Sequence, residues 1–255
     1  MADTDRNDWR TIGALALLAA CLVTFDHEAL GHGGACLALH GRILRLTSSI
    51  FHCSARSAWI DPAGPASNLV MGAIALALSW RVPRGRTALR LFLLLVGAFS
   101  WFWESGYLAR AMLRRDGDLY FFARAMLGEL SPVERWTGFA VGILLFIATA
   151  RVVSAGLLKL WPDARIARGV GRTAWLCATA GAAIAALGNT GHDWGDLRDA
   201  VLEIGGASFP LLFLPLRGGE PAGAPVAIGR SWPVIGLAVV VFALFVLTLG
   251  RGVSA

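Results

Sequence analysis

The sequence predicts an all-α polytopic membrane protein with six transmembrane helices, or seven if one short apolar piece also crosses. Of the 255 residues, 56% are hydrophobic and only 16% are charged, whereas an average soluble domain carries about 25% charged residues. Several apolar runs approach the roughly 20 residues that a helix needs to cross the hydrocarbon core. The net charge of +6 does not indicate nucleic-acid binding, because the arginines lie in short stretches between these runs, where they meet lipid head groups. We therefore expect a lipid bilayer as partner, and no nucleic acid.

The first apolar run covers residues 11–39, and its second half contains several ionisable side chains. The segment that follows, 41–61, is mixed in character, and residues 47–51 have the order of a strand. We expect a short strand-like or re-entrant segment at this position.

Five further runs complete the predicted set of helices. The second run begins at Pro65, a residue favoured in the first turn of a helix, and the third is interrupted by Glu104. The five runs are 65–80, 89–113, 136–157, 173–187 and 232–249. A shorter apolar piece, 204–216, is broken by Pro210 and Pro215, so the sequence leaves open whether it crosses.

The chain is expected to form one integral membrane domain over 1–255, with its N-terminus in the cytoplasm. A slight excess of Lys and Arg on the N-terminal side favours this orientation by the positive-inside rule. We expect no disulfide among the four cysteines, because no two have CxxC spacing. Cys21, Cys36 and Cys177 lie in apolar runs, where a buried thiol behaves as a small hydrophobic group.

Four ionisable residues stand close together in the first apolar run: Asp26, His27, Glu28 and His32. Each charge at the centre of a bilayer costs about 2.5–3.5 kcal/mol on insertion scales, so the cluster needs an explanation. Three interpretations are open, namely a helix end at the membrane surface, a pathway for ions or protons, and a metal site. The metal site is favoured, because His-Glu followed closely by His is typical of zinc hydrolases.

The spacing of the two histidines departs from the usual His-Glu-x-x-His. His27 and His32 are five residues apart, which separates them by ~140° on a regular α-helix. A one-residue π-bulge would return both to one face, and nearby glycines at 31, 33 and 34 make such a distortion easier. Alternatively Glu28 and His32, which are four apart, are the ligands and His27 is not.

Residues 27–32, which read His-Glu-Ala-Leu-Gly-His, resemble the site-2 protease family of intramembrane zinc metalloproteases (peptidase family M50), with Ala29 as an extra residue. Gly-Arg-Ile at 41–43 stands where that family has a turn and an edge strand. The block Ala-Gly-Pro-Ala-Ser-Asn at 63–68 is similar to a second motif of the family. The resemblance implies that Asn68 helps to hold the substrate. It also implies a metalloprotease core over 11–120, with additional transmembrane helices in 121–255.

The family's third ligand is an Asp that precedes Gly on a later helix. Asp116 and Asp118, in the run Asp-Gly-Asp, are the nearest matches, and Asp118 could instead cap the amphipathic stretch 119–130. A rival block at 189–196 contains His192 and Asp193. The order of the family's motifs favours Asp116 or Asp118. Glu104, His192 and Asp193 are then candidates for supporting roles behind the ligands.

The resemblance implies a Zn²⁺ ion held by His27, His32 and Asp118 or Asp116, with Glu28 as general base. The substrate would be a membrane-embedded protein or peptide in a bacterial inner membrane. Its unwound backbone could add as a strand to the segment 45–51. Two alternatives stay open: a membrane metallohydrolase for a lipid or small substrate, and a non-proteolytic protein. The latter is a metal or proton transporter or a degenerate homologue.

The alternatives predict different neighbours for the two imidazoles. A transporter predicts that Glu104, His192 and Asp193 converge with them on one pathway. A protease predicts instead that the segment 41–61 and Asp116 or Asp118 approach them.

Overall fold

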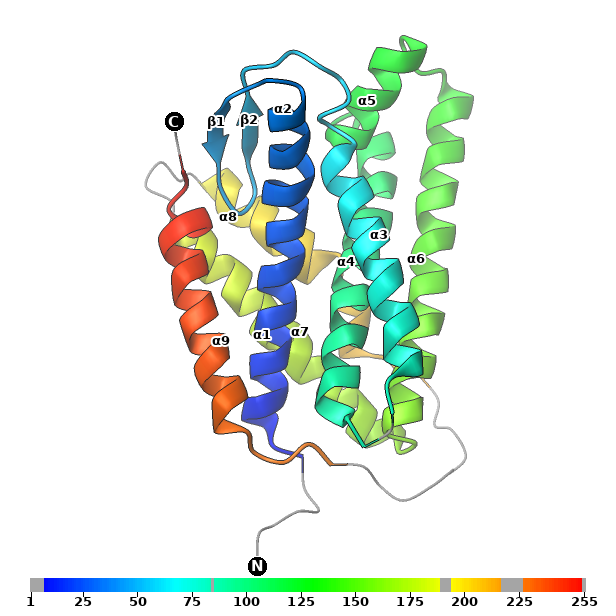
Figure 1. The fold of residues 1–255 in the computed structure, drawn as a ribbon. Coiled ribbons are helices and arrows are strands. Elements are labelled where there is room, and N and C mark those ends of the chain that lie inside the picture. Colours follow the sequence, from blue (N-terminus) through cyan, green and yellow to red (C-terminus); the bar gives the residue numbers. More distant parts are fainter. Residues whose placement is uncertain (1–6, 84, 189–193, 217–226, 254–255) are drawn as a thin grey trace, which may run out of the picture.

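A computed structural model describes residues 7–83, 85–188, 194–216 and 227–253. The described residues form a helical bundle with one small hairpin at the end opposite the start of the first helix (Figure 1). In chain order the elements are α1 (Trp9–Phe25), η1 (Asp26–Gly33), α2 (Gly34–Ala38), β1 (Ile43–Leu46), β2 (Phe51–Cys53), α3 (Ala63–Arg81), α4 (Thr87–Arg114), α5 (Asp118–Leu127), α6 (Pro132–Leu160), α7 (Ala164–Leu187), α8 (Trp194–Ala200), η2 (Val201–Gly206), η3 (Phe209–Leu212), α9 (Trp232–Phe245) and η4 (Val246–Gly250).

Among the described residues, six helices are long and apolar enough to cross a membrane, which confirms the six predicted runs. They cover Trp9–Ala38, Ala63–Arg81, Thr87–Arg114, Pro132–Leu160, Ala164–Leu187 and Trp232–Gly250. Side chains at several starts satisfy free backbone N–H groups. Asp8 accepts from Thr11 N ahead of α1, and Ser131 and Glu134 form a capping box at α6.

Helix α4 lies inside the bundle and packs against α1, α3 and α6. Its aromatic residues Phe99, Phe102 and Trp103 are almost fully buried. Close contact depends on small residues, since a side chain at Gly142 of α6 would meet the α4 backbone at Ala109 N, 2.7 Å away. On the outer surface, Leu144 and Val239 are more than 60% exposed, as expected for a bundle that lipid surrounds.

The short apolar piece left open by the sequence returns the chain along α7. Trp175, Arg172 and Arg168 of α7 donate to the carbonyls of Gly205, Leu212 and Pro215 at 2.7, 3.0 and 3.1 Å. The residue numbers of the acceptors increase while those of the α7 donors decrease, so the returning segment runs antiparallel to α7. The return path contains a π-helix, η2, and a 3₁₀-helix, η3, in place of one long helix. It allows α1, α7 and α9 to run in the same direction (Figure 1).

The segment after α2 forms the antiparallel hairpin β1–β2, which confirms a strand-like segment after the first helix. Leu46 of β1 also pairs with Val253 near the end of the chain through two backbone hydrogen bonds of 2.8 and 2.9 Å. The pairing therefore occupies one outer edge of the hairpin at Leu46.

The expectation that the four cysteines stay unpaired is wrong. Cys36 of α2 and Cys53 of β2 form a disulfide, with their Cα atoms 6.0 Å apart. Their separation of 17 residues gave no signal, because only the fold of the hairpin brings β2 back against α2. Gly41 makes room for the bridge, since a Cβ there would lie 2.5 Å and 2.8 Å from the two sulfur atoms. Cys21 and Cys177 are free thiols.

Candidate metal centre

The π-helix η1 brings the two histidines to one face, as the predicted bulge requires. Hydrogen bonds in a π-helix join residues five apart, and Gly34 N donates to Ala29 O in this pattern. His27 and His32 therefore lie one turn apart, with their Nε2 atoms at 3.2 Å. Both residues are at most 4% exposed.

Asp118 joins the two imidazoles from the start of α5. Its Oδ2 atom lies 3.4 Å from His32 Nε2 and 3.9 Å from His27 Nε2. Among the described residues, this is the group of three or more potential ligands whose atoms all lie within 4.8 Å of one another. Asp116 does not reach the group, because it is exposed and its Oδ1 accepts from Gly117 N at 2.9 Å. The group contains His27 and not Glu28, so it does not correspond to the alternative in which Glu28 and His32 are the ligands.

Tyr107 of α4 holds Asp118 in place. The Tyr107 hydroxyl donates to Asp118 Oδ2 at 3.3 Å and accepts from Asp118 N at 3.2 Å. Gly117 has φ +94°, and a Cβ there would lie 2.6 Å from the same hydroxyl. Burial would raise the pKa of Asp118, but contacts with the protonated rings of His27 and His32 outweigh burial, so in that state the pKa lies well below its usual value. Asp118 is thus set as a carboxylate that faces the rings.

The second nitrogen of each ring has a partner that fixes its proton. His32 Nδ1 lies 2.8 Å from Ile60 O, and since a carbonyl only accepts, Nδ1 carries the hydrogen. His27 Nδ1 lies 2.9 Å from Glu104 Oε1, to which it donates. In the neutral rings both Nε2 atoms then present lone pairs. Two lone pairs and a carboxylate oxygen at this separation fit a bound cation, and nitrogen and oxygen ligands suit Zn²⁺.

Glu104 and Asn68 form the support behind His27. Asn68 Nδ2 donates to Glu104 Oε1 at 2.8 Å, and Asn68 is fully buried. Neither residue is among those that line the cavity at the imidazoles. Glu104 therefore orients a ring in the way that carboxylates often orient metal-binding histidines. Asn68 positions Glu104 in this geometry, and the substrate contact expected of it stays a prediction.

Flat side chains and a glycine enclose the imidazoles. Trp103 stacks on His27 with ring centroids 4.5 Å apart, and Phe51 of β2 stacks on His32 at 5.5 Å. On α3, a Cβ at Gly64 would collide with His32 Nε2 and would lie 2.8 Å from His27 Nε2. In the Ala-Gly-Pro block, the backbone of Gly64 thus lies directly beside the Nε2 atoms of the two histidines.

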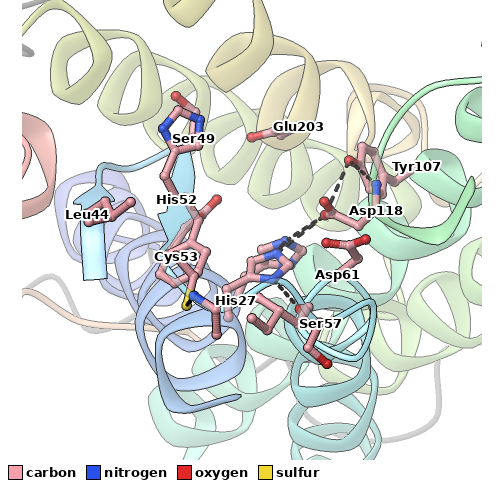
Figure 2. A pocket seen from close by; sticks show the side chains of 15 residues that line it. His27, Leu44, Ser49, His52, Cys53, Ser57, Asp61, Tyr107, Asp118 and Glu203 are labelled. Atoms are coloured by element: carbon pink, nitrogen blue, oxygen red, sulfur yellow. Dashed lines mark hydrogen bonds and ion pairs between the residues drawn. The ribbon is translucent and has the colours of Figure 1, made fainter. Parts of the chain in front are cut away.

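The ligand atoms open into a polar cavity of about 440 Å³ between the hairpin, α4, α5 and η2 (Figure 2). Glu28 lines this cavity together with both histidines and Asp118, and among the described residues its buried Oε2 has no hydrogen-bond partner. Figure 2 shows hairpin side chains, including His52, on one side of His27, and Asp61, Tyr107 and Asp118 on the other. A carboxylate oxygen therefore lies free in the same cavity as the three potential ligands.

Two acidic residues of the cavity were missed by sequence reasoning, Asp61 and Glu203. Burial, together with the nearby Asp118 charge, raises the pKa of Asp61 to about 6. Glu203 directly precedes the apolar piece 204–216, and an acidic residue at such a position was a signal for a site.

The rival block for the third ligand cannot be placed in full. His192 and Asp193 lie outside the described residues. Asp196 of the same block lies 3.6 Å from Arg45 of β1, where it joins α8 to the hairpin.

Comparisons of the chain with protein families, with curated proteins and with solved structures find no match.

Proposed function

We propose that the chain is an intramembrane zinc-dependent endopeptidase that cleaves a membrane-embedded peptide. The observation that carries the proposal is the convergence of His27 Nε2, His32 Nε2 and Asp118 Oδ2 within 4.8 Å. Glu28 lies in the same cavity, inside a bundle of membrane-length apolar helices. The set matches the requirements of a catalytic zinc site, which takes three protein ligands and keeps a further position open.

His27, His32 and Asp118 would hold the metal. A zinc ion at this place would supply Lewis acidity and would lower the pKa of bound water towards ~7. Glu104 and Ile60 keep hydrogens on the two Nδ1 atoms, so that both Nε2 atoms are free to bind. Glu28 Oε2, which has no hydrogen-bond partner within the described residues, accepts a proton from the attacking water and passes it to the leaving amine.

The hairpin supports a peptide as the substrate. Leu46 of β1 is joined to Val253, whereas among the described residues β2 pairs with β1 alone. Phe51, His52 and Cys53 of β2 line the cavity. An unwound stretch of substrate that adds to β2 would place its backbone hydrogen bonds beside the ligands and satisfy them away from lipid.

The protease, transporter and lipid-hydrolase interpretations predict different neighbours for the two imidazoles. Phe51 and Asp118 both lie beside them, as the protease interpretation predicts. Glu104 also contacts His27, as the transporter interpretation predicts, but it lies behind the ring and does not line the cavity. A lipid hydrolase would use the same ligands and would not need β2.

The decisive variant for catalysis is Glu28→Gln. Purified wild type and variant are reconstituted in vesicles with a library of single-span peptides, and products are identified by mass spectrometry. We expect cleavage in wild type, loss by at least about 100-fold in Glu28→Gln, and the same zinc content in both. Glu129→Gln, an exposed change on the loop before α6, should cleave as wild type does. Unchanged cleavage in Glu28→Gln, or none in zinc-loaded wild type, would contradict the proposal.

A further inference from the structure

The cavity contains a carboxylate for which the proposed mechanism has no use, that of Glu203. It stands on the π-helix η2 and lines the cavity across from the hairpin (Figure 2). Within the described residues it is not a member of the ligand group formed by His27, His32 and Asp118. π-helices are uncommon and occur often at functional sites, and both of those that border this cavity, η1 and η2, carry a glutamate into it.

Among the described residues none forms an ion pair with the Glu203 carboxylate, although Arg110 and His27 act on it electrostatically from a distance. Its Oε2 atom is buried and has no hydrogen-bond partner in the described part of the chain. The nearby cation Arg110 lies 4.0 Å from Asp199 and over the ring of Tyr107, at 5.2 Å. A buried carboxyl oxygen without a hydrogen-bond partner is costly, so a donor group from a ligand would relieve that cost.

An apolar groove adjoins the cavity at this residue. It has a volume of about 430 Å³ and lies between α4, α6 and η2, with Gly106, Phe146 and Phe209 in its lining. Tyr107 and Glu203 belong to the lining of both the groove and the metal cavity. The two spaces therefore meet at Glu203, with apolar walls on one side and the metal ligands on the other.

We propose that Glu203 binds a cationic group of the substrate, an ammonium or guanidinium, while the adjoining apolar stretch occupies the groove. The inference rests on the proposed function and adds the substrate class, a peptide with Lys, Arg or a free amine next to apolar residues and close to the scissile bond. A charge-assisted hydrogen bond to Glu203 would fix that group. Glu203 determines specificity and takes no part in the proton transfers of Glu28.

The first arm of the test needs no cleavage. Zinc-loaded protein in detergent is titrated at pH 7 with dodecylammonium and with dodecanol, and native mass spectrometry counts bound zinc and bound probe. We expect dodecylammonium to bind at least about tenfold more tightly than dodecanol, the loss typical of a charged hydrogen bond. The preference should vanish in Glu203→Gln, persist in part in Glu203→Asp, and be unchanged in Glu129→Gln. An amine that bound the metal instead would bind Glu203→Gln equally well, and that result, or equal binding of the two probes, would overturn the inference.

The second arm compares cleavage of matched peptides with Lys or norleucine at each position near the scissile bond. We expect kcat/KM to favour Lys at one position by about tenfold, and Glu203→Gln to remove the preference while norleucine peptides keep their rate. Equal losses for both peptides would show a structural role and would overturn the inference. A preference in the first arm without Glu28-dependent cleavage would leave the cation site standing and reject the peptidase. Glu28-dependent cleavage without any Lys preference would support the peptidase and reject the cation site.

Discussion

The approach of the two imidazoles depends on single residues, and Gly64 tolerates no side chain beside them. A Cβ at this position would collide with His32 Nε2. We predict that Gly64→Ala displaces the ring and weakens zinc binding by at least about tenfold, in the range seen when groups behind metal ligands are altered. Competition with a chelator measures the affinity, and circular dichroism checks that helix content is kept.

The matched control for Gly64→Ala is Gly34→Ala, because a Cβ at Gly34 would meet no atom within 4 Å. Gly34→Ala should bind zinc as wild type does. Equal affinity in the two variants would contradict the assigned place of Gly64 beside the ligand atoms.

At the scale of residues, the sequence predicted much of the site and missed what depends on long-range folding. His27, His32 and Glu28 could be read from one motif, because residue types and spacing carry that chemistry. Asp118 and Asp116 could not be separated in the sequence, since only the turn at Gly117 and the contact with Tyr107 distinguish them. The roles of Glu104 and Asn68 behind His27 depend on how α3 and α4 meet.

At the scale of elements, the π-helix η1 absorbs the extra residue of the His-Glu motif. Deletion of Ala29 would leave His27 and His32 four apart, and a regular α-helix would then keep both rings on one face. We predict that the deletion variant retains one zinc per chain, as measured by elemental analysis of the purified protein. Loss of zinc with intact helix content would show that the π-helix itself is required.

Deletion of Leu22 provides the contrast to deletion of Ala29. Leu22 lies in the regular α-helix α1, where loss of one residue rotates the two halves by ~100° relative to each other. This variant should lose zinc, because η1 can no longer face α3 and α5 while α1 keeps its packing.

Long apolar runs were the most predictable elements, since hydropathy alone identifies them. The return path through η2 and η3 was undecided, because a short apolar piece with two prolines does not specify a conformation. The disulfide was missed because residues 36 and 53 meet only once β2 has folded back, and a similar dependence on long-range folding left Asp118 and Asp116 unseparated.

At the scale of the whole molecule, six membrane-length helices and the return path along α7 place the first and last described helical residues at opposite ends of the bundle (Figure 1). The disulfide lies at the end of the bundle that holds the candidate metal centre, and disulfides persist in oxidising compartments. We predict that the N-terminus faces the cytoplasm and the hairpin faces the opposite side, which agrees with the slight excess of Lys and Arg. Protease protection of tags fused to each end of the chain measures the orientation, and both tags on one side would contradict it.

The most direct measurement of the central claim is the zinc content of the detergent-purified protein, with Asp118→Asn beside Asp116→Asn. The two aspartates are neighbours in the sequence, but Asp118 faces the imidazoles and Asp116 is exposed. We expect about one zinc per chain in wild type and in Asp116→Asn, and a loss of at least about tenfold in affinity in Asp118→Asn. No zinc above background in wild type purified without chelator, or equal binding in both variants, would contradict the metal centre.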